Sequence, residues 1–210
     1  MIIYPPDKSI LYHRMAFRLN MDFDNILRMH EMHRDDHFSD EEKVLLTLQM
    51  LIRPGSRWRL FFLKWPQRIE LMQAIIQNFI NIKAKKSNDP RKSMDFAQDS
   101  PYIYASFRQA YGIDLHKEKL DWREFMALLQ SMPEKTKIRE IIRIRTEPLP
   151  EPTKHNSKQI ARMIEAKAYW ALEVSEAEAQ QQFQQGIQRL ASVLRENASK
   201  APKKDGDSGG

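Results

Sequence analysis

Apolar residues recur at helical spacing along most of this chain, and that period is the feature that most limits its fold. Apolar positions three and four residues apart indicate amphipathic helices that bury one face. The 210 residues include only 6 glycines, which is too few for a fold rich in tight β-turns. The sequence therefore predicts an all-α protein: a compact bundle of about six helices, then a proline-rich linker and a long C-terminal helix.

Prolines divide the chain into this bundle and a C-terminal appendage. Residues 1–147 are predicted to form the helical bundle and residues 148–155 a stiff proline-rich linker. No proline interrupts residues 156–197, which are predicted to form one long helix, and residues 198–210 have the composition of a disordered tail. The apolar stripe of the long helix is narrow and changes phase across residues 175–182. Such a helix is expected either to fold back on the bundle or to dock on another chain.

Short-range signals predict where several helices begin and end. Ser39 and Glu42 have the spacing of a capping box, and Gly112 stands where a left-handed residue would end a helix. Asp121 is placed to cap a helix that buries Trp122 and Phe125. The carboxylates of this stretch are therefore interpreted as helix caps and turn residues rather than as acid–base catalysts.

The composition argues against several functional classes. The chain has no cysteine, which excludes disulfides and cysteine-ligated metals. No window approaches the ~18 uncharged apolar residues of a membrane span, and the first residues lack the pattern of a secretory signal. The net charge of +6 permits binding to polyanions without requiring it. Without a nucleophile elbow or a phosphate loop, we expect no catalytic residue, no cofactor, no enzymatic activity and a cytoplasmic location.

Three histidines form the pattern that most resembles a metal site. His30, His33 and His37 are spaced by three and four residues, with Asp35 and Asp36 nearby. The helix must end before the cap at residue 39, however, so the third histidine is expected to lie outside it. A solvated helix end is the favoured interpretation, and no metal site is predicted.

Cations and aromatic residues alternate in the segment 57–68, "RWRLFFLKWPQR". The favoured interpretation is a buried connector, in which the rings fill the core while the cations reach outward to solvent. Two alternatives remain open: a surface that stacks bases and holds phosphates, and a groove for a partner protein. The residues for nucleic-acid binding would be Arg57, Arg59, Lys64 and Arg68.

Two stretches resemble a known family of phage proteins. The first is residues 17–51, an aromatic and aliphatic helix followed by the acidic start "SDEEK" of a buried helix. The second is residues 95–145, in which "YIY" at 102–104, "YGIDL" at 111–115 and Trp122 follow the family's order. Together these stretches are similar to the bacteriophage gene-product-fifteen family, found in tail gene clusters of siphophages and of prophages of Gram-positive bacteria. The resemblance covers about residues 15–147.

The resemblance implies a tail assembly chaperone, which holds the helical tape-measure protein soluble until tube subunits polymerise around it. It implies that the tape-measure protein and also the tail tube protein are partners, and self-association is compatible with this role. It further implies that the protein acts in the bacterial host cytoplasm and is absent from the mature virion. The competing hypothesis is a nucleic-acid-binding phage protein that uses residues 57–68. The residues predicted to contact the client are Trp58, Phe61, Phe62, Trp65, Ile160, Ile164, Phe183, Ile187, Leu190 and Leu194.

Overall fold

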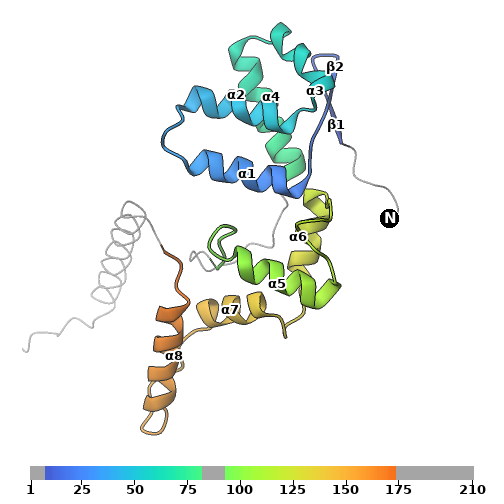
Figure 1. The fold of residues 1–210 in the computed structure, drawn as a ribbon. Helices are drawn as coiled ribbons and strands as arrows, with labels where there is room; N and C mark the ends of the chain where they lie inside the picture. The colour runs from blue at the N-terminus through green and yellow to red at the C-terminus, as the bar shows by residue number, and fades with distance from the viewer. Residues whose placement is uncertain (1–7, 82–92, 174–210) are drawn as a thin grey trace, which may run out of the picture. The chain divides into compact units, whose positions relative to one another are not determined.

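The computed structural model describes residues 8–81 and 93–173, and these are mostly helical (Figure 1). This confirms the predicted helical class, with one small antiparallel sheet in addition. In chain order the elements are β1 (Ser9–Tyr12), β2 (Met15–Arg18), α1 (Phe23–Arg34), α2 (Asp40–Leu51), α3 (Pro54–Arg57), the 3₁₀-helix η1 (Trp58–Phe62), α4 (Trp65–Ile75), the π-helical turn η2 (Ile76–Ile80), α5 (Ser100–Tyr111), α6 (Trp122–Gln130), α7 (Lys137–Thr146) and α8 (Ser157–Tyr169).

A β-hairpin that the sequence analysis did not predict opens the described chain. Strands β1 and β2 pair antiparallel, with Ser9 opposite Arg18. The two turn residues, His13 and Arg14, both have positive φ, 46° and 61°, as the right-handed twist of a two-residue hairpin requires. Neither residue is the glycine or asparagine that normally marks such a turn, so the local sequence gave no signal. The hairpin sends Phe17 into the core, where it is fully buried.

The predicted helix ends are confirmed in three places. Ser39 Oγ accepts from the Glu42 amide at 3.3 Å, while Glu42 Oε2 accepts from the Ser39 amide at 2.9 Å. Helix α5 ends at Gly112, whose φ of 69° is left-handed. Asp121 Oδ1 accepts from the Arg123 amide at 3.0 Å and caps α6. These contacts join residues close in sequence, which is why the pattern alone predicts them.

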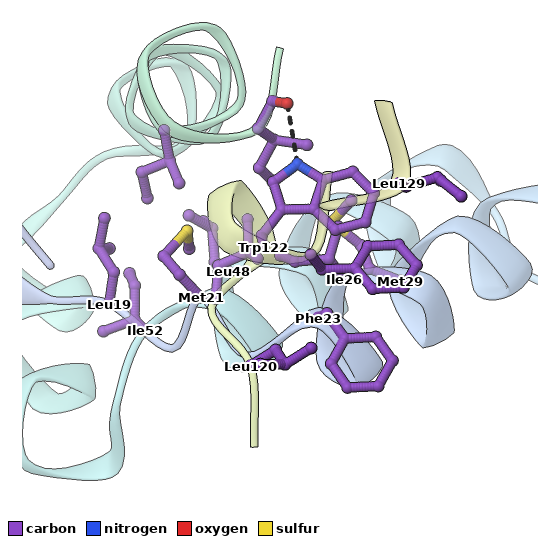
Figure 2. Packing of buried hydrophobic residues seen from close by; sticks show 14 of the residues in the cluster. Leu19, Met21, Phe23, Ile26, Met29, Leu48, Ile52, Leu120, Trp122 and Leu129 are labelled. Atoms are coloured by element: carbon purple, nitrogen blue, oxygen red, sulfur yellow. Dashed lines mark hydrogen bonds between the residues drawn. The ribbon is translucent and has the colours of Figure 1, made fainter. Parts of the chain in front are cut away.

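Trp122 lies at the centre of the core, as predicted (Figure 2). Its indole Nε1 donates to the carbonyl oxygen of Ile80 at 3.0 Å. This carbonyl ends η2 and has no partner of its own within the helix, so the indole satisfies a group that the helix end leaves free. Phe125 stacks on Trp122 and on Phe23, with ring centroids 5.8 Å and 4.8 Å apart.

Backbone contacts hold the entry of α1 against the entry of α6. The Phe23 amide donates to the Leu120 carbonyl at 3.0 Å, and the Trp122 amide donates to the Met21 carbonyl at 2.7 Å. These paired bonds fix α1 beside α6 although the two are about a hundred residues apart in the sequence, and the aromatic core forms between them.

Helix α8 folds back on α7. The Lys167 ammonium donates to the carbonyl oxygens of Ile144 and Arg145 at 2.7 and 3.1 Å, at the C-terminal end of α7. Arg145 Nε in turn donates to the Trp170 carbonyl oxygen at 2.6 Å. Of the two alternatives for the start of the C-terminal helix, the structure therefore shows docking on its own chain through residue 170.

The predicted continuous helix 156–197 differs from the structure at Trp170. Helix α8 ends at Tyr169, and residues 171–173 are not helical. The Trp170 ring packs edge-on against Tyr102 at 5.3 Å, and the Lys137 ammonium lies 4.7 Å from its centroid. These tertiary contacts hold the chain where local propensity would continue the helix. The described residues up to Ala171 belong to one compact unit. Residues 174–197 of the predicted helix and the tail 198–210 lie outside the described residues.

Candidate functional site

Four aromatic side chains, three in η1 and one at the first position of α4, are turned toward solvent. The exposed fractions are 53% for Trp58, 85% for Phe61, 69% for Phe62 and 36% for Trp65. We call these four residues the aromatic surface. Phe61 and Phe62 are among the most exposed large apolar side chains of the described chain, so the aromatic surface is a candidate site for binding a partner.

The interpretation of residues 57–68 as a connector whose rings fill the core is therefore wrong. Within this segment Leu63 is the side chain that reaches the core, with 4% exposure, and Leu60 packs partly against it. The 3₁₀ geometry of η1 has three residues per turn, so one position in three faces inward and the aromatic neighbours face away. Sequence alone does not show whether this short segment is 3₁₀ or α.

Two contacts hold the aromatic surface in place. The rings of Trp58 and Phe62 meet edge to face at 5.8 Å. The guanidinium carbon of Arg59 lies 5.1 Å from the Trp58 ring centroid, within the range of a cation–π contact. The aromatic surface is thus partly ordered before any partner binds, which lowers the entropy lost on binding.

The cations of the nucleic-acid alternative lie beside these rings, and three of them are fixed to the protein backbone. Arg57 Nε donates to the Ile52 carbonyl oxygen at 2.8 Å. Arg68 Nε donates to the Leu63 carbonyl oxygen at 3.1 Å, and Arg59 donates to the Ala16 carbonyl oxygen in β2. Each bond uses one guanidinium N–H and leaves the charge of the group unchanged. Lys64 is exposed.

The predicted second arm is only partly described. Ile160 is half-buried and Ile164 is 50% exposed on α8, so this helix offers apolar side chains to solvent. The remaining predicted contacts lie outside the described residues: Phe183, Ile187, Leu190 and Leu194.

The three histidines make separate contacts. His33 Nε2 lies 2.7 Å from Thr47 Oγ1, and His37 Nδ1 lies 2.7 Å from Asp35 Oδ1. His30 lies 6.2 Å from Trp122, measured between ring centroids. Partial desolvation lowers the pKa of both His30 and His33, and neighbouring cations lower it further. Within residues 8–81 and 93–173, no group of three side chains is arranged to hold a metal ion.

The carboxylates after α5 have structural contacts. Asp114 Oδ1 accepts from the His116 amide at 3.1 Å and from the Tyr104 hydroxyl at 3.3 Å. Desolvation raises the pKa of Asp114, but the amide of His116 and the nearby cations Lys117 and Arg108 outweigh that effect and hold the pKa below its usual value. Asp121 pairs with Lys8 at 3.1 Å besides capping α6. These contacts agree with the capping interpretation.

A concave surface, which the sequence analysis did not identify, lies between α1, α5 and α6. It is open to solvent and has a volume of about 310 Å³, with Phe23, Ile103 and Phe125 among its apolar lining and Asp24, Arg28 and Glu31 among its charged lining. Of these residues, Phe125 belongs to a helix face that was predicted to be buried. The groove was missed because a stripe shows that a helix packs, but not which helices leave space between them.

The fold and the candidate site define a mostly helical protein with an aromatic core and an exposed aromatic surface, in which the described helices include none that is long and apolar enough to cross a membrane. The family model described as "Bacteriophage Gp15 protein" matches residues 7–172, and the chain belongs to that family. The resemblance noted in the sequence is thereby confirmed, and the match extends past residue 147 into α8. Searches of curated proteins and of solved structures gave no match.

Proposed function

We propose that this phage protein is a non-enzymatic tail assembly chaperone that binds the helical tape-measure protein during tail morphogenesis. The observation that carries the proposal is the aromatic surface, in which Phe61 and Phe62 expose 85% and 69% of their area. Exposed, clustered apolar groups of this kind are typical of protein-binding surfaces. Membership in the phage family supports the context of virion assembly.

The mechanism is reversible burial of apolar stripes on the client. An amphipathic helix of the tape-measure protein would lay its apolar face on the aromatic surface, as amphipathic helices do when they bind apolar sites on other proteins. That contact prevents the stripes from associating with each other. Association costs about 4–15 kcal/mol of translational and rotational freedom. Burial of four rings therefore leaves a modest net binding free energy, and tail tube subunits can displace the protein from its client.

The proposal also states where the protein acts and which other proteins it binds. We place the activity in the bacterial host cytoplasm, before the tail is complete, with no copy in the mature virion. The tail tube protein is a further expected partner, and self-association is compatible with the role. The structural contacts of Asp114 and Asp121 support a role without catalysis.

The experiment is a tagged pull-down from the host that produces the phage, washed at low and then at high salt, with the partners identified by mass spectrometry. Three chains are compared: the wild type, the double variant Phe61→Ser with Phe62→Ser, and the control Leu149→Ser. The control removes an apolar side chain that is 45% exposed in the segment between α7 and α8. All three are expected to unfold at the same temperature, because the altered groups face solvent.

Recovery of the tape-measure or tube protein at both salt concentrations, by the wild type and the control but not by the double variant, supports the proposal. Recovery of nucleic acid alone, lost at high salt, overturns it. Loss at high salt is the expected signature of phosphate contacts, because each contact releases counterions. That result would assign the function to Arg57, Arg59, Lys64 and Arg68.

A further inference from the structure

We infer that the aromatic surface selects helices in which acidic residues flank the apolar stripe. The inference rests on the proposed function and adds the charge of the client to it. The occupant is thus an amphipathic helix with glutamate or aspartate beside its apolar face.

The segment that builds the aromatic surface carries positive charge and no negative charge. Between Glu42 and Glu70 the sequence contains no aspartate or glutamate. Residues 53–68 contain five cationic residues: Arg53, Arg57, Arg59, Lys64 and Arg68. A partner placed on the rings therefore approaches a local excess of positive charge.

The hairpin adds a cation to the same region. Helix α3 contacts β2 (Figure 1), and the amide of Arg18 donates to the buried hydroxyl of Ser56 at 3.2 Å. Lys8, Arg18 and Arg53 line one hollow. Residues 8–21 contain no carboxylate side chain. Lys8 is paired with Asp121, so the hairpin adds Arg18 to the cations of residues 53–68.

Within the described residues, the guanidinium groups are held by backbone carbonyl oxygens rather than by carboxylates. Arg53 Nε donates to the Leu19 carbonyl oxygen at 3.0 Å, and Arg57 and Arg68 make similar bonds to backbone carbonyls. Within the part of the chain that the structure describes, none of these three arginines makes an ion pair with a carboxylate. A guanidinium fixed by one N–H loses less side-chain entropy when the others bind a carboxylate.

A helical protein partner fits these features better than a polyanion does. Fixed guanidinium groups favour carboxylates at fixed positions, such as those one helical turn apart on a client helix. A DNA duplex and an anionic lipid surface bind to any dense positive charge and do not require guanidinium groups at fixed positions.

The test uses the full chain and two designed helical peptides that share one Leu/Phe stripe. One peptide carries glutamates beside the stripe, and the other carries lysines at the same positions. Affinities are measured by isothermal titration calorimetry at low and at moderate salt, for the wild type, for the variant with Phe61→Ser and Phe62→Ser, and for Leu149→Ser. Vesicles of anionic phospholipid and a short DNA duplex are the comparison ligands.

The glutamate peptide is expected to bind roughly tenfold more tightly than the lysine peptide at low salt, as a few exposed ion pairs predict. The difference should shrink at moderate salt, where charges about 10 Å apart are screened. The serine variant should bind neither peptide, whereas Leu149→Ser should match the wild type. Equal affinity for both peptides, preference for the lysine peptide, or tighter binding to the vesicles or DNA would overturn the inference.

Failure of the inferred charge preference can be distinguished from failure of the proposed function. If the pull-down recovers the tape-measure protein but the glutamate peptide has no advantage, only the inferred charge preference fails. If the peptide preference holds but no tail protein is recovered, the surface chemistry stands and the tail assembly role fails.

Discussion

Replacing Trp122 by alanine removes the side chain around which the core is built. The indole is 3% exposed and packs against Phe125 and Phe96, each with a ring centroid 5.8 Å away. Truncating a buried tryptophan or phenylalanine to alanine costs about 3–5 kcal/mol through lost transfer energy and the cavity left behind. The same change leaves the Ile80 carbonyl oxygen without the donor it has at 3.0 Å.

The cost of the hydrogen bond can be measured separately with Trp122→Phe. This variant keeps a ring in the core and removes the indole N–H, so its cost is expected to be about 1–3 kcal/mol, the penalty for a buried group without a partner. The alanine variant should therefore be clearly less stable than the phenylalanine variant. The cost of Trp122→Ala already includes the lost hydrogen bond, so the costs of the two variants are not added together.

The assay is equilibrium unfolding in urea followed by far-UV circular dichroism, which reports helix content and does not depend on tryptophan fluorescence. In thermal unfolding, a loss of about 3–5 kcal/mol in the free energy of unfolding corresponds to a fall in melting temperature of roughly 6–20 °C for a chain of this length. Trp58→Ala is the matched control, because Trp58 is 53% exposed and its loss should cost less than about 1 kcal/mol. A Trp122→Ala variant within about 1 kcal/mol of the wild type would refute the packing argument.

Two further predictions concern charged groups inside the fold. Arg145 donates to both carboxylate oxygens of Asp99 at 2.7 and 2.8 Å, and the Asp99 side chain is 1% exposed. Arg145→Met should thus cost about 3–5 kcal/mol in urea unfolding by leaving a buried charge unpaired, and an unchanged unfolding midpoint would contradict this. Desolvation, with Lys43, lowers the pKa of His33 from 6.5, so the unfolded chain binds the proton more readily. The free energy of unfolding should therefore fall as pH drops from about 6.5 toward the lowered folded value; His33→Gln should reduce that slope, and an unchanged slope would argue against it.

Local sequence predicted the features that depend on residues a few positions apart. The capping box of Ser39 and Glu42, the stop at Gly112 and the cap at Asp121 were all recognisable, because the donor and acceptor of each contact lie within one turn. The burial of Trp122 was also predicted, since it follows from the apolar stripe of its own helix. The family resemblance, which rests on the same local patterns, was confirmed.

The features that were missed have two different causes. The hairpin is local, but its turn at His13 and Arg14 carries neither the glycine nor the asparagine that marks such turns. Helix α8 ends at Tyr169 beside Trp170, which packs against a residue of α5 and is held by Arg145 of α7. No short window of sequence contains both partners of these contacts of Trp170.

The sequence by itself determined a helical chain, the ends of several helices and which faces are apolar, because backbone capping and amphipathic period are local properties. Only the tertiary structure decided which apolar residues are buried where the chain has no regular apolar stripe. Residues 57–68 show the difference: the composition fits a buried connector, yet the core admits Leu63 and leaves Phe61 and Phe62 exposed. The physical reason is that the core has a limited volume, already filled by side chains from the hairpin, α1, α2, α4, α5, α6 and α7, and close packing admits no further rings. The aromatic residues that the core cannot hold therefore lie on the surface.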